Sequence, residues 1–221
     1  MLFGVPYGRG ADAIARQCRE EGIATTLAEA QALIDYYFER YPGVRVFLDA
    51  CKQRVITPGW MQGVFGRYRR FGWSSDPIII KDQERQAGNF PIQNLVADAI
   101  WTALANLWDY RAQTGVDFKF KLQIHDAILL QVPFAHVPHV YREVFTRCMT
   151  DQVPIWPCDL NGRRLPLKQP YHLVGHRELM FRWSEDIDSL AETKLGADHP
   201  SITSLLEDPT NDKLVVGLLE Q

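Results

Sequence analysis

Two alternating segments flank the dipeptide His125-Asp126, and they set the strongest limit on the fold. Apolar residues alternate with polar ones before the dipeptide, and the alternation resumes after it. The apolar positions are Phe118, Phe120, Leu122, Ile124, Ile128, Leu130 and Val132. A period of two residues is typical of a strand with one buried face. Two such strands around a short polar break predict an antiparallel hairpin, with His125 and Asp126 at or next to its turn.

The dipeptide itself has two interpretations. Asp tolerates turn geometry and bonds to nearby backbone, so an ordinary turn explains the pair on its own. Alternatively, Asp126 at a rigid hairpin tip holds a divalent cation, since Mg²⁺ takes oxygen ligands. The local pattern favours the turn, and the rest of the chain has to decide between the two.

Helical patterns surround this hairpin. Helices are expected over residues 10–22 and 44–56, and between them a capping box at Thr26 and Glu29 opens a helix that Pro42-Gly43 ends. A further helix carries Val137, Val140, Val144, Phe145 and Cys148, and Asn161-Gly162 predicts a second hairpin. The expected fold class is α+β, with a small antiparallel sheet and long flanking helices.

The longest expected helix covers residues 82–111. Its apolar stripe is formed by Ile92, Val96, Ala99, Ala103 and Leu107, and Pro91 predicts a kink or break. Arg85, Asn89 and Gln93 recur every four residues and line one side of it. Such a row is usually a solvated face. It also suits the DNA minor groove, where every base offers an acceptor and a row of donors reads no sequence.

Composition and charge narrow the class of protein. No run is long and apolar enough for a membrane span, and no signal peptide is visible, so we expect a cytoplasmic protein. The scattered cysteines Cys18, Cys51, Cys148 and Cys158 indicate reduced thiols. Residues 184–221 carry a net charge of −7, which leaves +4 for the rest of the chain. A basic body with an acidic tail permits nucleic-acid binding without requiring it.

Several ordered segments resemble family A DNA polymerases. "ERQAGNFPIQNLVAD" is similar to their Arg-x-x-x-Asn-x-Pro-x-Gln segment, and "LQIHDAILLQVP" to motif C, a hairpin bearing His-Asp. "LIDYYFERYPGV" and "PGWMQGVFGRYRRF" match segments between motifs B and C, and "LFGVPYGRGADAIARQ" resembles the end of motif B in the fingers. The resemblance spans residues 2–133, and the segment that follows is longer than in the usual bacterial enzyme.

The resemblance implies a polymerase palm with partial fingers helices. It implies subdomains at residues 1–60 (fingers), 61–183 (palm) and 184–221 (a loosely attached acidic appendage). Asp126 would bind catalytic Mg²⁺ and His125 would lie near the primer terminus. The remaining implied contacts are Arg85, Asn89, Gln93, Arg67, Arg69 and Arg70 with primer–template DNA, and Phe3, Tyr7 and Gly8 with the incoming deoxynucleoside triphosphate.

The family's second catalytic Asp belongs to motif A, upstream of motif B, and the 221 residues contain no counterpart. Ala127 also replaces the Glu that usually follows His-Asp. The expectation is therefore template-directed DNA synthesis with an upstream fragment that carries motif A, and no synthesis by this chain alone. Two alternatives stay open: a non-catalytic DNA-binding fragment, and a metal phosphohydrolase that uses His125, Asp126, His136 and His139.

Overall fold

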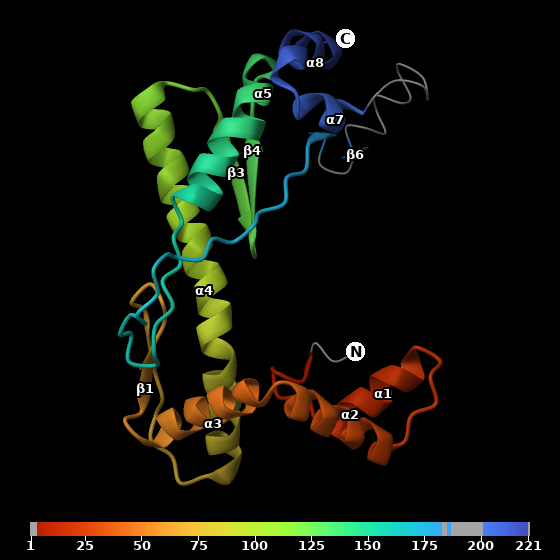
Figure 1. Ribbon diagram of the computed structural model, residues 1–221, viewed down its shortest axis with the longest axis vertical. Helices are drawn as coiled ribbons and strands as arrows, with labels where there is room; N and C mark the ends of the chain where they lie inside the picture. The colour runs from red at the N-terminus through yellow and green to blue at the C-terminus, as the bar shows by residue number, and fades with distance from the viewer. Residues whose placement is uncertain (1–3, 183–184, 187–200, 221) are drawn as a thin grey trace. The chain divides into compact units, whose positions relative to one another are not determined.

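The computed structural model describes residues 4–182, 185–186 and 201–220 (Figure 1). Helices and small antiparallel sheets both occur, so the expected α+β class is confirmed. Two compact units make up the chain, Met1–Leu95 with Pro157–Leu167 and Val96–Trp156 with Lys168–Gln221. Each unit is built around its own apolar clusters. The subdomain boundaries expected at residues 60 and 183 stay predictions.

The first unit opens with two packed helices, α1 (Ala11–Glu20) and α2 (Leu27–Arg40). The predicted capping box is present: the Thr26 hydroxyl accepts a bond from the Glu29 N–H, and the Thr26 N–H donates to the Glu29 carboxylate. The cluster between the helices contains Val5, Ile14, Ala15, Cys18, Ala30 and Ile34. The apolar spacing of both segments therefore predicts these helices correctly.

The helix α3 (Pro42–Ile56) and a small hairpin complete the sequence-local part of this unit. Pro42 begins α3 because its missing N–H needs no partner in a first helical turn. Strands β1 (Trp60–Gln62) and β2 (Tyr68–Arg70) pair antiparallel, with Trp60 opposite Arg70. Gly63 lies against α4, where a Cβ would stand 2.0 Å from the Asn94 Oδ1 atom. Only glycine fits at this close approach.

Helix α4 (Pro77–Thr114) is longer than expected and contributes to both units. It continues through Pro91, so of the predicted kink or break the break does not occur, and the kink stays a prediction. Of the predicted stripe, Ala99, Ala103 and Leu107 are buried, whereas Ile92 is 37% exposed. The polar residues Asn94 and Asp98 are buried beside the stripe. Among the described residues, no helix is both long and apolar enough to cross a membrane.

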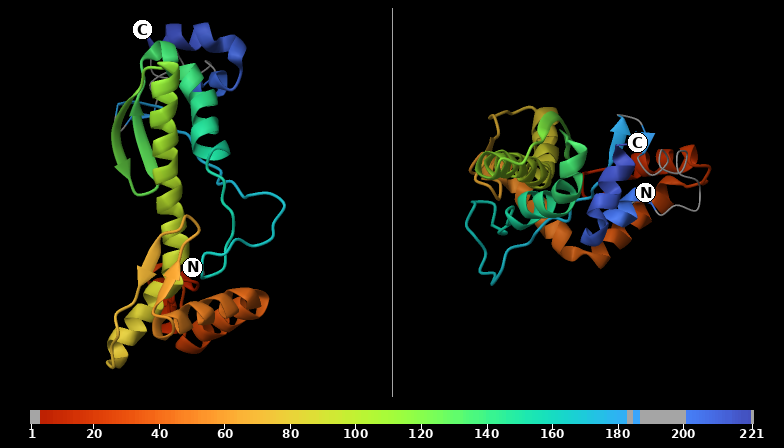
Figure 2. Two further views of the ribbon diagram at one scale, coloured as in Figure 1. Left: turned by 90° about the vertical axis from the view of Figure 1, so that its left-hand side faces the viewer. Right: turned by 90° about the horizontal axis from the view of Figure 1, so that it is seen from above.

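The predicted hairpin around His125 is confirmed in the second unit. Strands β3 (Lys119–Ile124) and β4 (Ala127–Gln131) pair antiparallel beside the later part of α4 (Figures 1 and 2). The pairing register shifts between Phe120 and Leu122. A shift of one residue turns the following side chains to the other face. Leu122 is consequently 49% exposed and Ile124 39% exposed, so the expectation of a buried face at these two positions is wrong.

A continuous helical run follows the hairpin. It consists of η2 (Phe134–His136), α5 (Val137–His139) and two π-helical segments, η3 (Val140–Val144) and η4 (Thr146–Asp151). Val140, Val144 and Cys148 pack against Leu107 and Phe118. The Asn106 amide of α4 donates to the carbonyl oxygens of Cys148 and Gln152 at 3.0 Å each. The predicted helix therefore exists, with wider turns than an α-helix.

The chain ends in strands and short helices within the second unit. These are β5 (Met180–Arg182), β6 (Glu185–Asp186), α7 (Ile202–Leu206), η5 (Pro209–Asn211) and α8 (Asp212–Leu219). Ile202, Leu206, Val215 and Leu219 pack on Val137 and Tyr141. The Arg142 guanidinium donates to both Asp212 carboxylate oxygens, at 2.6 and 2.7 Å. Residues 201–220 therefore pack on the helical run of the second unit, and the appendage expected over residues 184–221 stays a prediction.

Candidate functional site

The turn of the β3–β4 hairpin consists of His125 and Asp126 alone. Ile124 pairs with Ala127, so the loop between the strands has two residues. His125 has a φ of 50°, the left-handed region that costs most side chains energy. Its carbonyl oxygen accepts a 2.6 Å bond from the Gln123 side chain. Asp126 is exposed at the tip. The hairpin thus holds a carboxylate in solvent on a short, fixed turn.

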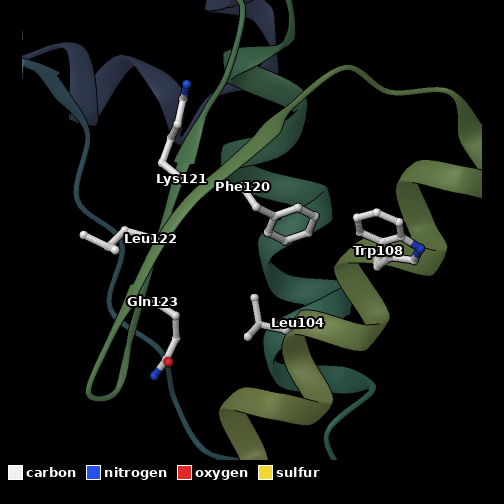
Figure 3. A pocket seen from close by; sticks show the side chains of 6 residues that line it. All are labelled: Leu104, Trp108, Phe120, Lys121, Leu122 and Gln123. Atoms are coloured by element: carbon white, nitrogen blue, oxygen red, sulfur yellow. The ribbon is translucent and has the colours of Figure 1, made fainter.

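An apolar hollow of about 320 Å³ lies next to β3 in the same unit (Figure 3). Its lining residues are Leu104, Trp108, Phe120, Lys121, Leu122 and Gln123. Phe120 and Trp108 face one another, with ring centroids 6.0 Å apart. The residues that line the hollow include no carboxylate and no histidine.

The row on α4 lies in the first unit, and its three members have different surroundings. The Arg85 guanidinium donates to the Asp82 carboxylate at 2.6 Å and remains exposed. Asn89 is half-buried, and its Oδ1 atom accepts no hydrogen bond from the residues that the structure describes. Gln93 is exposed. Arg85 and Gln93 are therefore exposed along the row, Asn89 is half-buried between them, and Asp82 pairs with Arg85.

The segment Gly4–Gly8 forms a tight turn ahead of α1. The Tyr7 N–H donates to the Gly4 carbonyl at 3.1 Å, and the Gly8 N–H donates to the Val5 carbonyl at 3.0 Å. Gly8 has a φ of 81°, and a Cβ there would stand 3.8 Å from Arg85 Cγ. The nucleotide candidates Tyr7 and Gly8 thus lie beside the start of the α4 row. Phe3 lies outside the described residues.

The three arginines of the β1–β2 hairpin have different surroundings. Arg69 donates to the Gln86 side chain on α4, and its guanidinium lies 5.9 Å from the centre of the Phe71 ring. Arg70 is exposed at the edge opposite Trp60. Arg67 is exposed at the hairpin loop, where its carbonyl accepts a bond from the Gly63 N–H. Arg69 therefore helps to fix the hairpin on α4, while Arg67 and Arg70 face outward.

The donor set tests whether the site fits Mg²⁺. Asp126 offers a hard oxygen ligand, which suits this ion. Within residues 4–182, 185–186 and 201–220, no group of three or more potential metal ligands gathers anywhere. Asp126 by itself therefore offers one oxygen-bearing group of the kind that Mg²⁺ takes, and the described residues supply no complete ligand set. His139 Nε2 lies 3.0 Å from the Tyr110 hydroxyl, within hydrogen-bonding distance, so the histidine pair of the phosphohydrolase alternative gains no support.

Two features of the site escaped the sequence analysis. The first is Asp82, whose pKa is held below its ordinary value because Arg85 and then Gln86 donate hydrogen bonds to its carboxylate. The spacing of Asp82 and Arg85, three residues apart on a helix, is the signal that predicts such a pair. The second is the segment Pro157–Leu167, which follows the second unit's helices in sequence but belongs to the first unit. No local pattern in the sequence predicts that return.

Comparisons with known proteins agree with one another. The model of DNA polymerase family A matches residues 1–167, so the similarity extends beyond Pro133. DNA polymerase I of Pseudomonas aeruginosa is 34% identical over 132 residues, which are 59% of this chain and 14% of that protein. The thermostable DNA polymerase I of Thermus thermophilus is 29% identical over 140 residues, which are 62% of this chain and 16% of that protein. The chain thus spans about a seventh of their length.

A solved structure shows the same similarity in three dimensions. It is the POL domain of Pol1 from M. smegmatis in complex with DNA primer-template and dNTP. The TM-score is 0.62 at 28% sequence identity, over 69% of this chain and 26% of that one.

Proposed function

The chain belongs to DNA polymerase family A, and we propose on that basis that it supplies part of the machinery of template-directed DNA synthesis. The observation that carries the proposal is the exposed Asp126 on a two-residue hairpin turn, where the family's motif C has its His-Asp. The match of the family model to residues 1–167 supports it. The partners proposed are primer–template DNA and deoxynucleoside triphosphates, by analogy with the complex of the similar POL domain.

The proposed reaction is nucleotidyl transfer. The primer 3'-hydroxyl oxygen forms a bond to the α-phosphorus of the nucleotide, the bond from that phosphorus to the β-phosphate oxygen breaks, and pyrophosphate leaves. Asp126 would provide one ligand to Mg²⁺, and His125 would lie near the primer terminus. When bound, divalent cations stabilise the attacking and leaving oxygens. Tyr7 and Gly8 would border the new base pair, and Phe3 would pack on the sugar.

The α4 row would contact the duplex. Arg85, Asn89 and Gln93 lie four residues apart on one helix, and Arg85 and Gln93 are exposed while Asn89 is half-buried. Their donors fit acceptors that every base pair presents in the minor groove. Replacing Arg85 with Ala should therefore weaken primer–template binding for all sequences alike. Fluorescence anisotropy with duplexes of different sequence measures this, and a strong dependence on one base position contradicts it.

We also propose that the chain synthesises no DNA by itself. Two-metal transfer needs both cations about 3.5–4 Å apart, and one carboxylate cannot hold both. The second carboxylate would come from a segment with the family's motif A, which is a proposed partner of this chain. The rival function, a DNA-binding fragment without catalysis, predicts DNA binding but no synthesis in any mixture.

Primer extension separates these possibilities. The assay uses the pure chain, the chain mixed with a fragment that carries motif A, and the same mixture with Asp126→Asn. We expect extension only from the mixture with the unaltered chain, because Asn lacks the charged oxygen that binds the metal. DNA binding should persist in the Asp126→Asn chain, since the α4 row is unchanged.

Asp117→Asn is the matched control, because Asp117 is an exposed carboxylate just before β3 in the same unit. Its mixture should extend primers normally. Extension by the pure chain would overturn the account of the second carboxylate. Normal extension with Asp126→Asn would remove Asp126 from the proposed site, and no extension in any mixture would favour the DNA-binding fragment.

A further inference from the structure

The segment Pro157–Leu167 packs on the β1–β2 hairpin of the first unit. The Gln62 N–H of β1 donates to the Leu160 carbonyl at 3.3 Å. The Leu160 side chain packs against the buried cluster of Cys51, Val55, Met61, Phe71 and Ala87. One backbone bond and one apolar anchor therefore fix this segment to the hairpin, although more than eighty residues of chain separate them.

The segment forms a stable turn of its own. The Asp159 carboxylate accepts bonds from the N–H groups of Asn161 and Arg163, at 2.8 and 3.0 Å. The Arg163 N–H bond, together with those from Asn161, holds the pKa of Asp159 below its ordinary value. Gly162 completes the turn with a φ of 79°. Asp159, the only acid of the segment, is thus hydrogen-bonded to backbone N–H groups of the same turn. These bonds also fix the backbone position of Arg163.

Two side-chain contacts place this turn over the tip of the β1–β2 hairpin. The Arg54 guanidinium donates to the Asn161 side chain at 2.7 Å. Gly162 lies so close to Gln62 that a Cβ would stand 2.1 Å from its Oε1 atom, and Gln62 in turn donates to the Gly66 carbonyl at 3.1 Å. Arg163 follows Gly162 and Arg67 follows Gly66 in sequence. The backbones at Gly162 and Gly66, which precede Arg163 and Arg67, therefore both lie against Gln62, and Arg54 contacts the same turn.

The charge at this place has one sign. Residues 54–75 contain four arginines and no acid, and residues 157–167 contain two arginines and only Asp159 as an acid. We call Arg54, Arg67, Arg70, Arg163 and Arg164 the arginine surface. Arg69 is left out because it points to Gln86 on α4. Guanidinium groups match phosphate oxygens with paired, planar donors, and several of them on one surface favour a polyanion.

We propose that Arg54, Arg163 and Arg164 extend the DNA contact expected of Arg67 and Arg70, so that the arginine surface as a whole binds the phosphate backbone of DNA in addition to the α4 row and the Asp126 turn. Its ligand rests on the proposed function, which brings DNA to this chain. Phosphate contacts strengthen and orient binding without reading sequence. The segment Pro157–Leu167 thereby serves as an added clamp on DNA, and Gly162 and Leu160 set its position.

The salt dependence of DNA binding tests the proposal. Each phosphate contact that is lost reduces the slope of log K against log[salt] by about 0.9. Arg163→Gln should reduce the slope by about one contact and weaken binding severalfold at low salt, equally for all sequences. Arg163 is the best choice because its hydrogen bonds in the turn are made by its backbone N–H and carbonyl, so Gln preserves the fold. Anisotropy of a labelled duplex with the full chain, titrated with NaCl, gives the slope.

Two further variants separate position from charge. Lys213→Gln removes one charge from the exposed surface of α8 and should leave the slope unchanged. Gly162→Val keeps every arginine but forces a β-branched residue into a left-handed conformation against Gln62. We expect Gly162→Val to release the segment, which faster alkylation of Cys158 reports, and to reduce the slope as Arg163→Gln does.

The outcomes are distinguishable from a failure of the proposed function. Arg85→Ala measures the function's own contact in the same assay. Loss with Arg85→Ala but none with Arg163→Gln overturns the arginine surface alone, and so does an equal loss with Lys213→Gln. A slope that stays unchanged while Cys158 becomes reactive in Gly162→Val overturns the clamp. No DNA binding by the unaltered chain overturns the proposed function itself.

Discussion

The backbone conformation of His125 orients the neighbouring residue Asp126. His125 lies at a φ of 50°, where glycine is at ease and most side chains are strained. Histidine is one of the residues found there more often than average, and its carbonyl is held by Gln123. Strain of this kind persists where the surrounding structure imposes it, and it gathers at functional sites. The conformation of His125 fixes the direction in which Asp126 leaves the turn.

Substitutions at His125 should therefore separate stability from activity. His125→Gly should be neutral or stabilising by about 0.5–1 kcal/mol, and His125→Val should destabilise by about 1–2 kcal/mol. Both variants should lower primer extension in the mixture with the motif A fragment. Urea unfolding followed by circular dichroism measures the first effect. Equal stability of the Gly and Val variants would mean that the left-handed conformation is not maintained in solution.

Arg85 is paired with Asp82, and this pair competes with DNA for the guanidinium. Asp82→Asn should tighten primer–template binding severalfold, because it frees Arg85 and removes a negative charge near phosphates. Asp49→Asn is the control, since it removes the acid of another exposed ion pair, with Lys52, in the same unit. Anisotropy measures both. If both variants tighten binding equally, net charge explains the effect and the pair plays no specific part.

Among the elements, the capped helices could be predicted and the exposed surfaces could not. Thr26 and Glu29 predict the start of α2 correctly, because all the residues of the capping box lie within four positions of the sequence. The exposure of Leu122 follows from a register shift, which depends on the partner strand and leaves no local signal. Pro91 predicts a kink or a break, and α4 continues without a break because packing along a long helix outweighs one missing bond. The approach of Gly8 to Arg85 likewise joins segments that no local pattern connects.

The capping box makes the stability of α2 dependent on pH. The Glu29 pKa lies below its ordinary value because the Thr26 N–H and hydroxyl donate to its carboxylate. Because the pKa of Glu29 is lower in the folded chain than in the unfolded chain, its ionised carboxylate stabilises the fold. This contribution is fully present above pH 4.5 and is lost as the pH falls through the pKa of Glu29 in the folded chain. Thr26→Ala should lower the free energy of unfolding by about 1 kcal/mol at neutral pH. The loss should be smaller at a pH far below 4.5. Urea unfolding measures this, with Thr25→Ala as the control; a cost independent of pH contradicts it.

At the scale of the whole molecule, each unit has clusters of its own, and each contains a buried cysteine. Cys51 belongs to a cluster of the first unit and Cys148 to one of the second. Burial raises the pKa of Cys51 to about 11 and also raises the pKa of Cys148. Since the thiolate is the reactive form, both thiols should be protected in the folded chain.

Alkylation in increasing urea should therefore report the two units separately. We expect Cys51 and Cys148 to become reactive at different urea concentrations, because local opening follows the stability of each cluster. Mass spectrometry of the alkylated peptides gives both midpoints. Coincident midpoints would show that the chain unfolds as one cooperative body and that α4 couples the units.

The β3–β4 hairpin also bears on how the protein behaves in a test tube. In the part of the chain that the structure describes, this sheet has two strands, so each strand keeps one open edge. Leu122 and Ile124 add exposed apolar surface beside those edges. Open edges and apolar patches are the features through which protein chains aggregate. We therefore expect Leu122→Lys to raise the concentration at which the protein stays monodisperse, because it places a charge beside an open strand edge next to Asp126.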